Sequence, residues 1–163
     1  RLIVVGGGNS ALQEAIFLTR YAAHIDLLVR STMKASEVLQ KELQKRVDAG
    51  QITVHLGVTP EAVVAKDGAF SGLQAVQNGH STVFSADGLF VFIGLIPNTQ
   101  FLAGLAVELD LGGHIVTDTH LQTSLPGVFA SGDVRAGATM QIAAAVGEGA
   151  QAALQIREYL QSL

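Results

Sequence analysis

Three consecutive glycines near the start of the chain are the residues best suited to bind a ligand. Gly6, Gly7 and Gly8 follow the apolar run Leu2–Val5 and fit the spacing G-x-G-x-x-A with Ala11. A glycine at the first position permits a tight bend, and a glycine at the third lets a diphosphate approach the backbone. A small residue at the last position lets a helix pack closely on the strand. The pattern therefore favours a dinucleotide site over an ordinary glycine-rich turn.

A second group of polar residues follows the next apolar run, Ile25–Val29. Arg30 comes about 20 residues after Gly8, at the place where a dinucleotide fold selects its cofactor. Two hydroxyl residues and Lys34 follow, and no acid occurs before Glu37. An acid here would bind the ribose of NAD, whereas basic residues bind the 2′-phosphate of NADP. The residues of this loop therefore favour NADP over NAD. The alternative is that Arg30 and Lys34 are solvated loop charges that bind no cofactor.

The elements that must position these residues alternate between strands and helices. The predicted elements are buried strands at Leu2–Val5, Ile25–Val29, Ile52–His55 and Leu89–Ile93, helices at Ser10–Ala22 and from the N-cap Ser36 to Ala49, and short antiparallel strands at Ala62–Ala65, Gly72–Val76 and Ser81–Phe84. Asp67-Gly68 and Asn78-Gly79 are typical hairpin turns. This order predicts an α/β fold with an antiparallel excursion, and a domain boundary after Gly94.

The remaining residues, 95–163, have a weaker pattern. Gly127–Val134 reads as a strand that runs into a turn with an exposed acid, and Gln141–Leu160 reads as a long helix with one apolar face. One helix and one or two strands form a poor core for about 70 residues. We therefore expect either disorder in this segment or pairing between copies of the chain, as in a homodimer. Because Arg1 directly precedes a buried strand, we also expect the chain to be a fragment of a longer protein.

Composition excludes several kinds of site. The 163 residues carry a net charge of −4 without a basic run, which argues against nucleic acid as a partner. The longest apolar stretch, Leu89–Ile96, is too short to cross a membrane, and no signal peptide precedes the first strand, so a cytoplasmic location is expected. There is no cysteine for a disulfide or a thiolate metal site. No metal site is expected from the scattered histidines His24, His55, His80, His114 and His120.

Three ordered motifs carry a family resemblance that covers the whole chain. They are Gly-Gly-Gly-Asn-Ser-Ala at 6–11, a buried strand that ends at Gly94 before Pro-Asn-Thr at 97–99, and Thr-Ser-Leu-Pro-Gly-Val-Phe-Ala-Ser-Gly-Asp-Val at 123–134. Together they resemble the thioredoxin reductase type of FAD-dependent pyridine-nucleotide-disulfide oxidoreductase. The resemblance implies a Rossmann-like three-layer ββα NADPH-binding domain at 1–94. It implies that 95–163 are the C-terminal portion of an FAD-binding domain, which is incomplete here.

The resemblance also implies which residues contact the cofactors. The positions that match NADPH contacts are Gly6, Gly7, Gly8, Asn9, Ser10 and Glu14 near the diphosphate, Arg30 and Lys34 near the 2′-phosphate, and Ile93 and Gly94 beside the nicotinamide. The positions that match FAD contacts are Gly132, Asp133, Gln141, Ile142 and Ala143. Two departures weaken the match: Leu28-Val29-Arg30 replaces the common His-Arg-Arg, and Met140 stands where the family often has Arg.

The activity that the resemblance implies is an NADPH-dependent flavoprotein oxidoreductase, with a part in redox homeostasis. In the full-length parent, hydride would pass from NADPH to FAD, and the electrons to thioredoxin or a similar redox protein. This chain has no Cys-x-x-Cys pair and no catalytic residue of its own, so we expect it to be inactive alone. Two alternatives remain: a ferredoxin or flavodoxin-NADP reductase of the same type without the cysteine pair, and a non-catalytic NAD(P)H-binding module.

Overall fold

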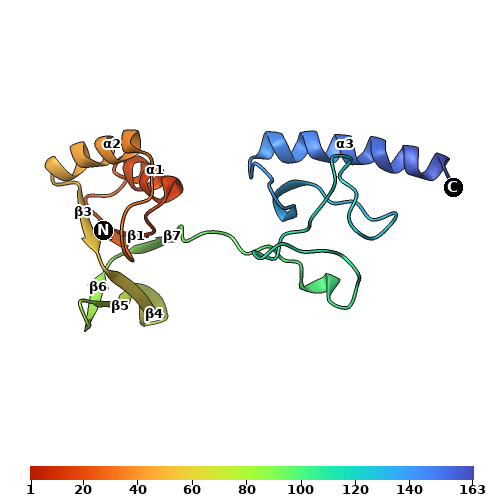
Figure 1. Cartoon of the computed structure of the whole chain (residues 1–163). Helices are drawn as coiled ribbons and strands as arrows, with labels where there is room; N and C mark the ends of the chain where they lie inside the picture. The colour runs from red at the N-terminus through yellow and green to blue at the C-terminus, as the bar shows by residue number, and fades with distance from the viewer. The chain divides into compact units, whose positions relative to one another are not determined.

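The computed structural model describes residues 1–163 and divides them into two compact units, Arg1–Gly94 and Leu95–Leu163 (Figure 1). The first unit contains a parallel sheet of strands β1 (Leu2–Val5), β2 (Ile25–Val29), β3 (Ile52–Leu56) and β7 (Gly88–Val91), in the order β3-β2-β1-β7. An antiparallel sheet holds β4 (Val58–Lys66), β5 (Ala69–Gln77) and β6 (His80–Ser85), in that order. Helices α1 (Asn9–Leu18) and α2 (Glu37–Asp48) connect the first three parallel strands. The predicted α/β fold with an antiparallel excursion is confirmed.

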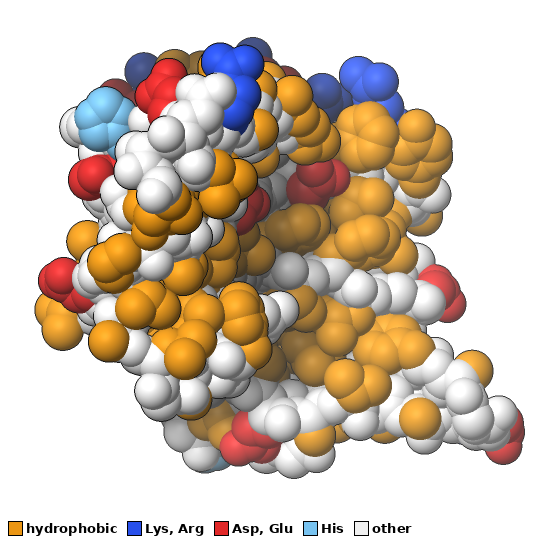
Figure 2. All heavy atoms as spheres, turned by 90° about the vertical axis from the view of Figure 1, so that its right-hand side faces the viewer, with side chains coloured by type: hydrophobic (Ala, Val, Ile, Leu, Met, Phe, Trp, Pro, Cys, Tyr) orange, Lys and Arg blue, Asp and Glu red, His pale blue; other side chains and the backbone are white.

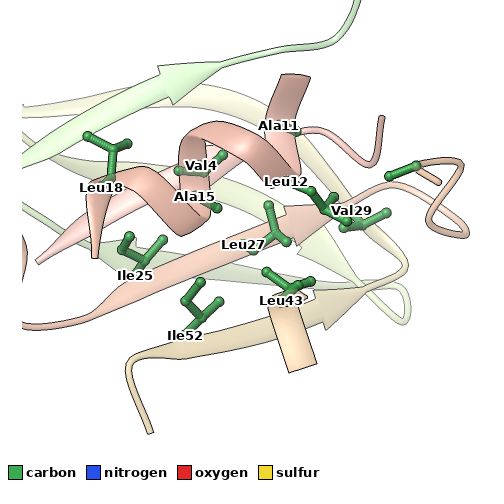
Figure 3. Packing of buried hydrophobic residues seen from close by; sticks show 11 residues of the cluster. Val4, Ala11, Leu12, Ala15, Leu18, Ile25, Leu27, Val29, Leu43 and Ile52 are labelled. Atoms are coloured by element: carbon green, nitrogen blue, oxygen red, sulfur yellow. The ribbon is translucent and has the colours of Figure 1, made fainter. Parts of the chain in front are cut away.

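Two apolar clusters make the first unit a three-layer structure. The cluster on the helix side of the parallel sheet includes Val4, Ala11, Leu12, Ala15, Leu27 and Leu43 (Figure 3). The cluster toward the antiparallel sheet includes Ile3, Val5, Leu28, Val58, Leu73 and Ala75. Successive residues of a strand point to opposite faces, so β1 and β2 are buried on both sides. Burial on both faces explains why the sequences of these strands are almost continuously apolar.

The capping and turn residues act largely as the sequence predicts. The Ser36 hydroxyl accepts a hydrogen bond from the Leu39 amide at 3.5 Å, which caps the start of α2. Asp67 and Asn78 both have a left-handed backbone, with φ of 54° and 52°, and each precedes a glycine with positive φ. Both hairpins therefore use the pair of left-handed residues that suits the twist of a β-ribbon. The three antiparallel strands extend further than predicted, with ladder pairs from Val58–Gln77 to Lys66–Ala69 and from Gly72–Ser85 to Gln77–His80.

Helix α1 is shorter than predicted. It ends at Leu18, whereas the periodicity suggested an end at Ala22. The Thr19 hydroxyl donates to the Ile16 carbonyl at 2.7 Å, and the Tyr21 amide bonds three residues back to Leu18 at 2.9 Å. These contacts satisfy the last carbonyls of the helix without another α-helical turn.

The second unit contains little regular structure. Its elements are α3 (Ile142–Gln161) and two short 3₁₀ turns, η1 (Gln100–Leu102) and η2 (Gly132–Val134), and the rest is loop with isolated bridges. The predicted strand at Gly127–Val134 is wrong, because Phe129 forms only a single bridge and no neighbouring strand extends it into a ladder. No helix of the chain combines the length and apolarity that crossing a bilayer requires.

The predicted apolar face of α3 is not buried within the second unit. Ala152 is the only buried residue of this 20-residue helix, while Ile142 is 86% exposed and Val146 is 68% exposed. Hydrophobic side chains make up a large part of the face seen in the space-filling view (Figure 2). Pairing between copies of the chain would cover such side chains, and it remains a prediction.

Candidate functional site

The three glycines after β1 have different steric surroundings. Gly6 has a φ of +142°, and a side chain there would collide with the Phe92 carbonyl oxygen and lie 2.9 Å from the Ala11 methyl. A side chain at Gly7 would lie 2.8 Å from Val29 and 3.2 Å from the carbonyl of Thr32. By contrast, nothing lies within 4 Å of the place where a side chain would project from Gly8. Gly6 and Gly7 therefore allow close packing, and Gly8 leaves open space.

That open space lies at the N-terminus of α1. Gly8 is the N-cap residue, no side chain caps the helix, and the first turn carries no acid. Leu12 is the first residue whose amide bonds back along the helix, to the Gly8 carbonyl at 3.2 Å. The preceding amides of the first turn have no acceptor within the helix, so they and the helix dipole favour an anion.

A cavity of about 570 Å³ joins the glycine turn to the loop after β2. Seven predicted NADPH contacts line it: Gly6, Gly7, Gly8, Arg30, Lys34, Ile93 and Gly94. Three others, Asn9, Ser10 and Glu14, lie in the first turns of α1 and do not line the cavity. The lining also includes Thr59 and Pro60 of β4, which the sequence pattern did not indicate. Thr59 and Pro60 reach the cavity because of the way the antiparallel sheet packs, and no local sequence motif predicts that packing.

The basic side chains of the cavity are available to an anion. Arg30 and Lys34 are both exposed, and neither forms an ion pair with any carboxylate of the chain. A guanidinium and an ammonium group on one loop suit a phosphate that carries about two negative charges. The cavity thus offers an uncapped helix N-terminus at one wall and two unpaired cations at another. These features fit the diphosphate and the 2′-phosphate of NADPH.

The predicted FAD contacts lie together in the second unit. Asp133 belongs to η2 and is exposed, Gln141 is the N-cap of α3, and Ile142 and Ala143 begin that helix. Neither a side-chain cap nor an acid occupies the first turn of α3. Free amides and an exposed carboxylate fit a diphosphate and sugar hydroxyls, respectively.

An ion pair holds η2 on α3. Glu148 of α3 accepts a hydrogen bond from the Gly132 amide at 2.8 Å and pairs with Arg135 at 2.5 Å. The hydrogen bond from Arg135 has the largest effect and that from the Gly132 amide the next largest. Both lower the pKa of Glu148 below its ordinary value. Glu148 therefore fixes the turn that carries Asp133, although no sequence motif singled it out.

A buried carboxylate at the other end of the sheet was also missed. Asp26 lies near the start of β2, and its side chain accepts hydrogen bonds from Arg1 at 2.7 Å and His55 at 2.9 Å. Burial raises the pKa of Asp26, but the hydrogen bonds from Arg1 and His55 outweigh that effect and lower it overall. Because the cavity lies at the carboxyl ends of the strands, this cluster stabilises the fold and does not line the site. The sequence signal for this cluster was Asp26 itself, a single acid within an otherwise apolar strand.

Comparisons with known proteins match most of the chain. The family model for pyridine nucleotide-disulphide oxidoreductases matches residues 1–149. The chain is 36% identical to a thioredoxin reductase of Listeria monocytogenes over 165 residues, which cover 99% of this chain and 50% of that protein. It is 41% identical to the NADPH-dependent thioredoxin reductase 3 of Arabidopsis thaliana, covering 99% of this chain and 31% of that protein.

A solved structure shows the same fold. The thioredoxin reductase of Lactococcus lactis matches 99% of this chain and 53% of its own with a TM-score of 0.80, at 33% sequence identity. The chain therefore spans about half the length, or less, of the curated relatives it matches.

Proposed function

Because the chain belongs to the pyridine nucleotide-disulphide oxidoreductase family, we propose that residues 1–94 bind NADPH and that residues 95–163 supply part of an FAD site. The whole protein is then an NADPH-dependent flavoprotein oxidoreductase. Together the two cofactors would supply two electrons and one proton, which with one further proton would reduce a disulfide to two thiols. The names of the relatives, thioredoxin reductases, support thioredoxin or a similar redox protein as the partner.

The observation that carries the proposal is the cavity that links α1 to the loop after β2. Gly8 and the uncapped amides of α1 bind the diphosphate, as the open space above Gly8 supports. Arg30 and Lys34 bind the 2′-phosphate, since no carboxylate of the chain competes for them. Ile93 and Gly94 line the same cavity and border the nicotinamide.

Further predicted contacts lie in α1 and in the second unit. Ser10 and Glu14 of α1 border the bound nucleotide near the first turns of that helix. In the second unit, Gly132 and Asp133 hold the ribityl side of FAD, where the exposed carboxylate accepts hydrogen bonds from hydroxyl groups. Gln141, Ile142 and Ala143 present the first amides of α3 to the flavin cofactor.

Assembly and location form part of the same proposal. A homodimer would cover apolar side chains such as Ile142 and Leu160, which are 86% and 62% exposed. The cytoplasm is the proposed location, with a role in redox homeostasis, because the reaction needs a supply of NADPH. The thioredoxin reductase relatives favour disulfide reduction over transfer to ferredoxin.

Titration of the purified chain with NADPH and NADH tests the proposal. We expect saturable binding of NADPH, followed by the fluorescence of the reduced nicotinamide, and weaker binding of NADH. A Gly8→Asp variant should lose both, because a carboxylate would enter the space proposed for the diphosphate. Absence of binding to the unmodified chain, or binding that Gly8→Asp leaves intact, would refute the assignment of this cavity.

A further inference from the structure

Two loops meet at the carboxyl edge of the parallel sheet, and three hydrogen bonds join them. The Gly7 carbonyl accepts hydrogen bonds from the amides of Lys34 and Ala35, at 2.7 Å and 3.1 Å. The side-chain oxygen of Asn9 accepts one from the amide of Ser36 at 2.8 Å. The first loop holds the glycine turn, and the second carries the two unpaired cations. The two loops are thus fastened to each other directly.

The chemistry of the Asn9 contact fixes the orientation of its side chain. A backbone amide can only donate, so the Asn9 oxygen, and not its NH₂ group, must face Ser36. Ser36 is in turn the N-cap of α2, where its hydroxyl accepts from Leu39. Asn9 is the first residue of α1. One side chain therefore connects the N-termini of both helices.

Packing shows how closely the loops approach. A side chain at Gly7 would lie 2.8 Å from Val29 and 3.2 Å from the Thr32 carbonyl, so only glycine permits this contact. Of the three linking hydrogen bonds, the two to Gly7 are between backbone atoms. The bond from Ser36 to Asn9 is the one that a single side-chain substitution can remove.

We infer that Asn9 is a specificity-determining positioning residue, which holds Arg30 and Lys34 at a set distance from the glycine turn. A ligand that carries both a diphosphate and a 2′-phosphate then meets two sites whose spacing is fixed before it binds. A ligand without the 2′-phosphate contacts the glycine turn but not the two cations. Its affinity therefore does not depend on the distance between the two loops. Asn9 thus contributes to the preference for NADPH over NADH. The inference rests on the proposed function of residues 1–94.

The test compares the ratio of the NADH and NADPH dissociation constants in three forms of the full chain. In Asn9→Ala the ratio should fall about tenfold, with NADH affinity within about twofold of the unmodified chain. Asn9→Asp keeps an acceptor oxygen for Ser36. Its added charge should weaken both ligands, while the ratio stays near that of the unmodified chain. Asn98→Ala, an exposed asparagine of the second unit, is the matched control and should leave both constants unchanged.

A second measurement needs no ligand. The Ser36 amide should exchange with solvent faster in Asn9→Ala than in the unmodified chain or in Asn9→Asp, and circular dichroism checks that each variant is folded. If Asn9→Ala weakens NADPH and NADH equally, Asn9 acts as a direct contact and the inference is wrong. An unchanged ratio also overturns it, while the proposed function stands. An unmodified chain that binds neither nucleotide overturns both.

Discussion

The two units of the chain differ in how they bury apolar side chains. In Arg1–Gly94, residues such as Ile3, Leu12 and Leu27 are fully buried between layers of the same unit. In Leu95–Leu163, large apolar residues such as Phe101 and Ile142 are 76% and 86% exposed. The first unit is organised around its own core. The second unit leaves many of its large apolar side chains exposed.

This difference separates the two cofactor proposals. The cavity of the first unit is lined entirely by residues of that unit, from Val5 to Gly94. Of the predicted FAD contacts in the second unit, Gly132 is buried, whereas Asp133 and the residues Gln141, Ile142 and Ala143 at the start of α3 are exposed. We therefore propose that the first unit binds NADPH by itself, whereas the second supplies only part of an FAD site.

Separating the units at Gly94 should give the largest effect. Residues 1–94 alone should unfold cooperatively with heat and still bind NADPH, because their core and cavity are complete. Residues 95–163 alone should show no cooperative transition, because a single helix and loops bury too little apolar surface. Circular dichroism during heating measures both. A cooperative transition from monomeric 95–163, checked by sedimentation, would remove the contrast between the units.

A matched pair of leucine substitutions should sharpen the contrast. Leu27→Ala in β2 should lower the free energy of unfolding by about 3 kcal/mol, because it leaves a cavity in a closed core. Leu160→Ala in α3, where the side chain is 62% exposed, should change it by less than about 0.5 kcal/mol. Urea unfolding of the full chain provides both values. A large loss for Leu160→Ala would indicate that another copy of the chain covers α3 in solution.

The same contrast explains which features could be predicted from the sequence. The glycine turn, the Ser36 cap and the Asn78 turn depend on a few adjacent residues, and the structure has each as predicted. In the second unit, the strand predicted at Gly127–Val134 did not form, because a ladder needs a neighbouring strand that no local pattern supplies. The helix α3 was predicted correctly, and its apolar face lies exposed, in a segment that the sequence predicts to be too poor in regular structure to form its own core.

Contacts between distant residues were beyond a reading of local motifs. Thr59 and Pro60 reach the cavity only because the antiparallel sheet packs beside the parallel one. Asp26 finds Arg1 and His55 through the register of neighbouring parallel strands, since each partner lies on or next to an adjacent strand. The assignments of individual residues to NADPH and FAD contacts remain predictions, which the following experiment addresses for the first unit.

Removing both cations should show whether the first unit holds a complete phosphate site. The double variant Arg30→Ala/Lys34→Ala should weaken NADPH binding by more than about 100-fold, since each charge-assisted hydrogen bond contributes about 1.5–3 kcal/mol. NADH affinity should change by less than about twofold, because NADH has no 2′-phosphate. Isothermal titration of the full chain and of residues 1–94 gives the constants.

The control for that experiment removes the same charge elsewhere. Lys66→Ala/Arg157→Ala changes two exposed cations outside the cavity and should leave NADPH affinity nearly unchanged at physiological salt. Equal losses in the two double variants would mean that net charge, and not the loop after β2, attracts the nucleotide. A loss that appears only in residues 1–94 would mean that the second unit contributes to the site.

The smallest expected effect is on the pH dependence of stability, and each unit has one carboxylate to test. Hydrogen bonds lower the pKa of Asp26 below 3.8, despite the opposing effect of burial, and they lower that of Glu148 below 4.5. A carboxyl group whose pKa is lower when folded stabilises the fold above its unfolded pKa, and the stabilisation is lost as pH falls through the folded value. Both units should therefore lose stability below about pH 4.

The variants Asp26→Asn and Glu148→Gln assign this loss to a unit. The single side-chain oxygen of Asn, in the place of Oδ1, can still accept from Arg1 Nη2 and from His55, although the bond from Arg1 Nε to Oδ2 is lost. Asp26→Asn should therefore fold at pH 7 and show a flatter fall of the first unit's urea midpoint between pH 5 and pH 2.5, roughly the range where carboxyl groups titrate. Glu148→Gln should leave that profile unchanged and instead alter exchange of the Gly132 amide, whose acceptor it modifies. Glu158→Gln, an exposed acid of α3, is the control and should affect neither. If Glu148→Gln shifted the acid profile of the first unit, the two units would be coupled energetically, and their independent cores would not explain their different behaviour.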